Sequence, residues 1–146
     1  IRDTKRVGDL HQIEAILEEK KNYPPLEAGT YKKNQTISVW PSWKNEFAGQ
    51  LGEQPPLDPI NTIATCTPSY SCSDCDYNLR TCWDSNNNQF LDGSPDNLPS
   101  GSHVYSYEKT DSGYNICAPI ETTYDISTVD DGSSFCPDPS IGVSIP

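Results

Sequence analysis

Residues 1–22 read IRDTKRVGDLHQIEAILEEKKN, with one Gly and no Pro. The apolar side chains of this stretch recur at helical spacing and share one broad side of a helix. They are Val7, Leu10, Ile13, Ile16 and Leu17. Pro24 and Pro25 end the pattern, because proline lacks a backbone N–H and disfavours helix at the residue before it. The stretch therefore predicts a long amphipathic helix whose apolar stripe another element must cover.

The predicted helix lacks a capping signal at its N-terminal end. Ile1, Arg2 and Asp3 place no capping residue before the first turn, and the chain does not begin with Met. We therefore expect the helix to be the second half of a longer one. No apolar run approaches the roughly 20 residues that span a bilayer. We thus expect the chain as given to lack a membrane segment that the longer helix would carry.

The length of 146 residues suits one domain, which composition divides into five regions. These are 1–22, the helix; 23–65, an irregular connection; 66–100, a Cys-rich loop region; 101–121, a β-hairpin; and 122–146, a C-terminal loop tied by Cys136. The expected fold class is α+β, with a long N-terminal helix packed on a small antiparallel sheet. The rest is expected to form a disulfide-rich, loop-rich head.

Two short elements are expected inside the connection. Residues 35–40 are a strand candidate, and residues 42–50 are a short helix candidate with Ser42 as its N-cap. Large apolar side chains of this region are expected to dock onto the first helix. They are Trp40, Trp43, Phe47 and Leu51.

Two alternating stretches, 103–109 and 114–120, predict a pair of antiparallel strands. The positions that share a face are Tyr105 and Tyr107 in the first strand and Tyr114, Ile116 and Ala118 in the second. The intervening residues 110–113 read TDSG. Short polar side chains that bond the backbone and a Gly that accepts positive φ favour a tight turn there.

The chain is acidic, and the charge is unevenly placed. It has 10 basic and 21 acidic side chains, for a formal net charge of −11. Residues 1–44 carry eight basic and six acidic side chains, whereas residues 45–146 carry two basic and fifteen acidic ones. Such a surface repels a phosphate backbone, so we expect no direct binding of nucleic acid by the head. We interpret the acidity as a solvated surface of a secreted protein.

Six cysteines are expected to form disulfides: Cys66, Cys72, Cys75, Cys82, Cys117 and Cys136. An even number of cysteines in a turn-rich chain indicates an oxidising compartment. Among the 15 pairings that remain open, the working set is Cys66–Cys82, Cys72–Cys75 and Cys117–Cys136. The last would hold the C-terminal loop to a predicted strand. Zinc and a thioredoxin-like CxxC are alternatives, but the spacing suits zinc poorly and nearby aspartates oppose a low thiol pKa.

Catalytic motifs are absent from the sequence. The two histidines, His11 and His103, lie far apart in the chain, and no pair of carboxylates has a distinguishing context. We therefore expect no catalytic residue and no cofactor.

Residues 84–92 begin like a calcium-binding loop, with Asp84, Asn86 and Asn88 at alternate positions. An EF-hand needs Gly at its sixth position and Glu at its twelfth, where this chain has Gln89 and Pro95. No metal site is assigned on this basis. Calcium remains an alternative to a set of solvated turns rich in Asp and Asn.

Several segments together resemble type IV pilins and the pseudopilins of type II secretion. RDTKRVGDLHQI at 2–13, AILE at 15–18 and YP at 23–24 are similar to the second half of the long pilin helix and its end. LDPIN at 57–61 is similar to a segment of the connection, and TCWD at 81–84, LPSGSHVY at 98–105 and YNICA at 114–118 are similar to the head. The spacer before YP is short here, and six cysteines exceed the one pair common in pilins.

This resemblance implies a structural subunit of a filament. Such a subunit is made as a prepilin, is cleaved and methylated at its mature N-terminus, and is anchored in the bacterial inner membrane through the missing segment. It then assembles through its helix, here the stripe named above, into an extracellular or cell-surface filament. Partners would be copies of itself, related subunits and the assembly machinery. The filament would serve adhesion, motility, DNA uptake or protein secretion.

The alternative is a secreted disulfide-rich binding module for calcium or glycan, with the helix as a stalk. A small secreted hydrolase is a third, less favoured class.

Overall fold

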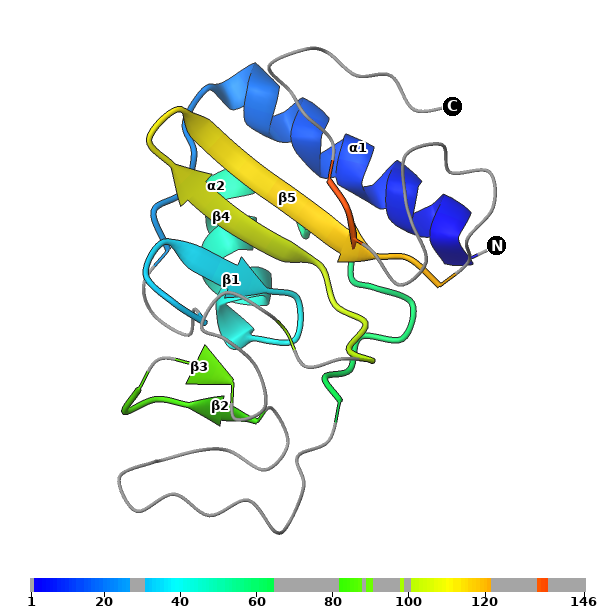
Figure 1. The fold of residues 1–146 in the computed structure, drawn as a ribbon. Helices are drawn as coiled ribbons and strands as arrows, with labels where there is room; N and C mark the ends of the chain where they lie inside the picture. The colour runs from blue at the N-terminus through cyan, green and yellow to red at the C-terminus, as the bar shows by residue number, and fades with distance from the viewer. Residues whose placement is uncertain are drawn as a thin grey trace, which may run out of the picture.

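In the computed structural model, the described residues are 2–26, 31–64, 82–87, 89–90, 98, 101–121 and 134–136. They form an α+β fold in which helix α1 (Arg2–Lys20) lies along a small antiparallel sheet (Figure 1). The N-terminal end of α1 lies near the C-terminal end of strand β5, and the helix runs beside this strand (Figure 1). The expected α+β class and the helix-on-sheet packing are confirmed.

The helix ends at Lys20, shortly before Pro24, as its sequence predicts. Lys21 adopts a left-handed conformation at φ 56°, and its N–H donates to the carbonyl oxygen of Leu17 at 2.9 Å. This bond satisfies one carbonyl of the last turn, and the prolines prevent further helix.

The sheet has the strand order β1-β4-β5-β6, and its centre is the expected hairpin. The hairpin consists of β4 (Ser106–Thr110) and β5 (Gly113–Pro119), and Thr110 pairs with Gly113 at the turn. At φ 155°, Gly113 fits a tight reversal that a side chain would strain.

Two short strands flank the hairpin. Strand β1 (Gln35–Ile37) pairs with β4, and strand β6 (Ser134–Phe135) pairs with β5. Both are antiparallel to their neighbours. The expected strand at 35–40 is therefore shorter than predicted, because the N–H of Trp40 turns back to the carbonyl oxygen of Ile37 at 2.9 Å.

The strand predicted from His103 begins only at Ser106. His103 instead forms an isolated antiparallel bridge with Thr62, with N···O distances of 2.8 and 3.1 Å. The carbonyl oxygen of Tyr105 accepts from the backbone N–H of Ser38 at 2.8 Å. Residues 103–105 thus pair with two different segments before the regular ladder starts.

The predicted helix at 42–50 is present, with a different start. A π-helical turn (Trp43–Phe47) continues into α2 (Ala48–Leu51), which Gly52 ends at φ 82°. The prediction of Ser42 as the N-cap is wrong, because Ser42 is itself helical and its side chain makes no capping bond. Its buried hydroxyl pairs with that of Thr36 on β1.

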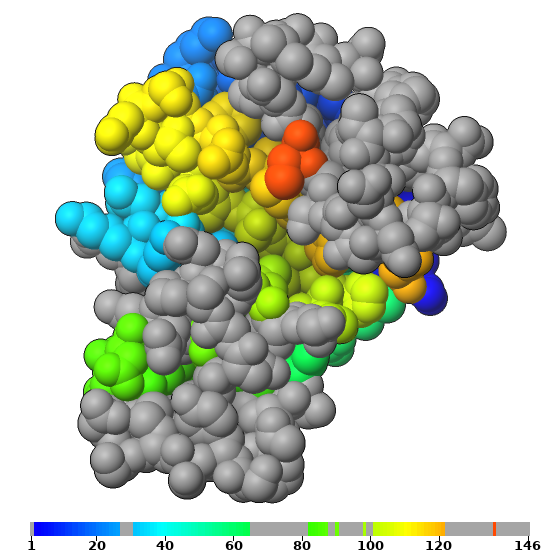
Figure 2. All heavy atoms as spheres, viewed as in Figure 1, coloured from blue at the N-terminus to red at the C-terminus, as the bar shows by residue number. Residues whose placement is uncertain are grey.

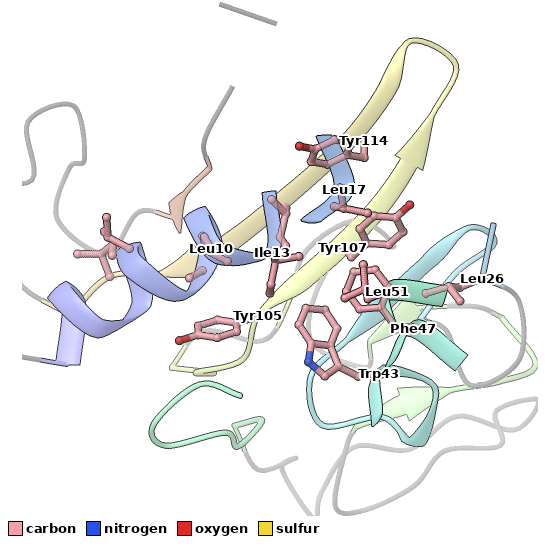
Figure 3. Packing of buried hydrophobic residues seen from close by; sticks show 14 residues of the cluster. Leu10, Ile13, Leu17, Leu26, Trp43, Phe47, Leu51, Tyr105, Tyr107 and Tyr114 are labelled. Atoms are coloured by element: carbon pink, nitrogen blue, oxygen red, sulfur yellow. The ribbon is translucent and has the colours of Figure 1, made fainter. Parts of the chain in front are cut away.

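The main core lies between α1, the hairpin and the Trp43–Leu51 helix. Leu10, Ile13 and Leu17 point from α1 toward the tyrosines of the hairpin segment (Figure 3). The aromatic side chains of this core are Trp43, Phe47, Tyr105, Tyr107 and Tyr114. The expected docking of residues 43, 47 and 51 near the helix is confirmed.

A second, smaller core lies beside the short hairpin of β2 (Trp83–Asp84) and β3 (Gln89–Phe90). Trp40 belongs here and not against α1, contrary to the prediction, with its ring centroid 6.4 Å from that of Trp83. Much of the predicted Cys-rich region 66–100 and of the C-terminal loop 122–146 lies outside the described residues.

Candidate functional site

The apolar stripe of α1 is buried within the chain's own main core. Val7, Leu10, Ile13 and Leu17 are all buried in the main core, and Ile16 is partly buried against it. These side chains contact the chain's own sheet and aromatic core. The structure thus places the stripe that was predicted to mediate assembly against the chain's own sheet.

A buried cluster of charges holds the first two turns of α1 to the head. The guanidinium of Arg6 donates from Nε to Oδ2 of Asp58 at 2.7 Å and from Nη2 to Oδ1 at 3.1 Å. Both side chains are 0% exposed. Asp58 Oδ1 also accepts from the backbone N–H of Ile60 at 2.8 Å. A single carboxylate thus shapes the turn at 58–60 and neutralises the buried arginine.

The remaining nitrogen of Arg6 reaches two further carboxylates. Nη1 donates to Asp3 Oδ1 at 2.8 Å and to Glu121 Oε2 at 2.6 Å. Arg2 forms a second bidentate pair with Glu121, with both distances 2.7 Å. Asp3 also accepts from the backbone N–H of Glu121 at 3.0 Å. We call these four residues and Asp58 the Arg6 cluster: two arginines and three carboxylates from α1, the connection and the segment that follows β5.

The pKa values within the Arg6 cluster follow from these contacts. Burial would lower the pKa of Arg6, but its hydrogen bonds to Asp58, Glu121 and Asp3 raise it above the ordinary value. The hydrogen bond from Arg2 and the bonds and charge of Arg6 outweigh burial and lower the pKa of Glu121 to about 2. These contacts favour the charged forms of Arg6 and Glu121.

The Arg6 cluster was not predicted, although the sequence holds a signal for it. Arg6 lies four residues before Leu10 and seven before Ile13, so it shares the side of the helix that carries the apolar stripe. An arginine at such a position is buried and needs carboxylate partners. The sequence does not indicate which of its 21 acids supply them.

One more ionic contact extends this arrangement along α1. Asp9 accepts from the hydroxyl of Tyr105 at 2.6 Å and pairs with Lys5 one helical turn earlier. Burial and the bond to Asp9 raise the pKa of Tyr105, so its hydroxyl remains a donor. Polar contacts therefore hold one side of the helix, and the apolar stripe holds the side that faces the core.

The opposite side of α1 is open to solvent. Its exposed residues are Arg2, Thr4, Lys5, Gly8, Gln12, Ala15, Glu19 and Lys20. Charges at both ends enclose a middle of small or uncharged side chains. This side of α1 is the longer of the exposed helical surfaces in the described residues, because the Trp43–Leu51 helix is shorter.

Cys117 on β5 and Cys136 beside β6 form a disulfide, as predicted. The bond spans a sequence separation of 19 and joins Cys136 to the sheet. Strand β6 lies on the surface beside β5 (Figure 2). Cys82 is also disulfide-bonded. Its predicted partner Cys66 and the predicted pair Cys72–Cys75 lie outside the described residues.

The calcium candidate is described only in part. Asp84 is fully buried, and its carboxylate accepts from the backbone N–H of Asn86 at 3.0 Å and from the side chain of Asn87 at 2.7 Å. Asn88 and Asp92 lie outside the described residues. Within the described ranges, no group of three or more His, Cys, Asp or Glu side chains is placed to hold a metal ion.

The two histidines serve separate local contacts. His11 Nδ1 lies 3.1 Å from Glu14 Oε1 on the same helix, and His103 sits in the bridge to Thr62. The structure therefore does not bring them together.

Comparison of the chain with family models, curated proteins and solved structures finds no match. Among the helices of the described part, none is long and apolar enough to cross a bilayer.

Proposed function

We propose that this chain is a subunit of a type IV pilus or of a related pseudopilus. The observation that carries the proposal is a contact between the two segments on which the resemblance chiefly rests. Arg6 belongs to the helix segment 2–13 and Asp58 to the segment 57–61, and they form the buried bidentate pair. Two motifs that are distant in sequence thus share one task, which is to fix the helix to the head.

Two further features support this proposal. The helix has one side packed on an antiparallel sheet and the other side exposed, which leaves a surface for neighbouring subunits. The Cys117–Cys136 disulfide suits a head that is exposed outside the cell. On this proposal the partners are other subunits and the assembly machinery, the filament is extracellular, and no residue is catalytic.

The assembly surface that we propose is the exposed side of α1, with Ala15 and Gln12 near its centre. A substitution there changes subunit packing without disturbing the core, because both side chains face solvent. Asn115 on β5 provides a matched control. It is also exposed, but its neighbours Tyr114 and Ile116 face the core, so Asn115 points to the other face of the sheet.

The test uses cells that make the full protein. Surface filaments are sheared off, collected by centrifugation, and probed for this chain by mass spectrometry and by antibodies to the head. We expect the chain in the filament fraction. Ala15→Arg should lower its amount there at least fivefold at an unchanged cellular level, whereas Asn115→Arg should leave it unchanged.

Two outcomes would overturn parts of this proposal. Recovery of the chain only as free protein in the medium contradicts a filament subunit and favours the secreted binding module. Filaments that contain the chain and tolerate Ala15→Arg as well as Asn115→Arg contradict the exposed side of α1 as the assembly surface.

A further inference from the structure

Helix α1 is held to the head by two different kinds of contact along its length. Beyond residue 9, the fully buried side chains are Leu10, Ile13 and Leu17, which pack on the tyrosines of the sheet. In residues 2–7, the buried side chains are Asp3, Arg6 and Val7, so charges provide most of the attachment.

When α1 is separated from the head, the two attachments expose different groups to water: hydrocarbon surface in one case and charges in the other. When an apolar face is lifted from the core, its hydrocarbon surface is transferred to water, which is unfavourable in proportion to area. When a buried ion pair is separated, each charge regains the hydration that burial had removed, and this offsets much of the lost attraction. The first two turns therefore detach more readily than the rest of the helix.

Gly8 lies at the boundary between the two attachments. It is exposed, and a Cβ added there would meet no atom within 4 Å. Gly52, Gly101 and Gly113 each have a positive φ that favours glycine, whereas Gly8 is inside a regular helix. Glycine weakens a helix interior, and neither space nor backbone conformation demands it here.

We propose that α1 is hinged at Gly8 and that the Arg6 cluster is the latch that holds residues 2–7 against the head. On release, these turns lose their helical order as a unit while residues 10–20 stay packed on the sheet. The inference does not rest on the proposed filament function, since every contact it uses is within one chain.

Native-state hydrogen exchange of the oxidised protein tests this inference. The informative amides are those of residues 6–9, the first that bond within the helix, and those of residues 13–17. Ile13→Val weakens only the apolar attachment. It should lower the protection of residues 13–17 by about threefold to tenfold and leave residues 6–9 unchanged. Equal losses in both groups would show that α1 opens as one unit, which overturns the proposal.

Two variants test the latch and the hinge separately. Glu121→Gln removes charge-assisted bonds from Arg6 and Arg2 and should lower the protection of residues 6–9 at least tenfold. Unchanged protection there would contradict the latch. Gly8→Ala should raise the protection of residues 6–9 about fourfold. The exposed control Gln12→Ala, within the packed part, should leave residues 6–9 unchanged, and equal gains in the two variants would contradict a hinge at Gly8.

Discussion

Replacement of Asp58 by asparagine tests the buried pair most directly, because it removes one charge at nearly constant shape. The oxygen of the introduced amide can keep the bonds that Asp58 Oδ1 accepts from Arg6 Nη2 and from the N–H of Ile60. The amide nitrogen then replaces Oδ2, which accepts from Arg6 Nε at 2.7 Å in the native protein. The amide N–H and the Nε–H of Arg6 would then face each other as two donors, and Arg6 would lose one of its two hydrogen bonds to residue 58.

The size of the effect follows from burial. Arg6 and Asp58 are both 0% exposed, so water cannot take the place of the lost acceptor while residues 2–7 stay packed on the head. Removing one member of a buried ion pair typically destabilises a protein by about 3–5 kcal/mol, because the other charge is left uncompensated. Asp3 and Glu121 still neutralise Arg6, so we expect about 3 kcal/mol, the lower end of this range.

Urea unfolding of the oxidised protein, followed by far-UV circular dichroism, measures this change. With a slope of about 1.5–2 kcal/mol per molar urea, the midpoint should fall by roughly 1.5–2 M at constant slope. The control is Lys21→Gln, which removes an exposed ion pair with Glu18 and should change stability by less than about 1 kcal/mol. The double variant of Asp58→Asn with Arg6→Met should be less destabilised than the two single losses added together.

A loss below about 1 kcal/mol for Asp58→Asn would refute this reasoning. It would mean that the Arg6 guanidinium behaves as an exposed charge does, with water or another acceptor available to it. An additive double variant would likewise show that the two side chains do not act as a pair.

Three more perturbations have defined outcomes. The pKa of Glu121 is held at about 2, below its ordinary 4.5, so this group contributes stability above pH 4.5 that is lost as pH falls toward 2. The difference in unfolding free energy between wild type and Glu121→Gln should be about 2 kcal/mol at pH 6 and should shrink toward pH 2. A difference that stays constant with pH would exclude the ionic cause. Joint replacement of Cys117 and Cys136 by Ser should reduce stability by about 3 kcal/mol in thermal unfolding, and no loss would contradict a constraint on the unfolded chain. Ile13→Ala should lower the free energy of unfolding by about 2–5 kcal/mol in the same assay, because Ile13 is fully buried. The exposed control Gln12→Ala should change it by under about 0.5 kcal/mol. Similar values for the two variants would contradict the packing of α1.

Local patterns made the main elements predictable from the sequence. The helix followed from apolar side chains at helical spacing and from Pro24, and the hairpin followed from alternation around the TDSG turn. Each of these signals acts between residues that are close in the chain. The start of β4 was not predictable, since His103 pairs with Thr62, which is distant in sequence, for reasons that lie in tertiary contacts.

The candidate site shows the same limit. Burial of Arg6 could have been read from its position on the apolar side of the helix, but its partners are 52 and 115 residues away. Ser42 had the residue type of an N-cap, yet its hydroxyl is bonded to Thr36 in the tertiary structure. Side-chain partners across such separations depend on how the elements pack, which a single sequence does not specify.

The mixed attachment of α1 also has a thermal consequence. Apolar attraction weakens on cooling, because the hydration of hydrocarbon becomes less unfavourable. The hydration of charged groups becomes less favourable on heating, so ion pairs such as those of Arg6 gain relative weight in a warm environment. On heating, the apolar attachment through Leu10, Ile13 and Leu17 therefore levels off, while the ionic attachment through Asp3, Arg6 and their partners continues to gain. The two ends of one helix thus differ in their temperature dependence, and the charged end contributes relatively more to the anchoring of α1 in a warm environment.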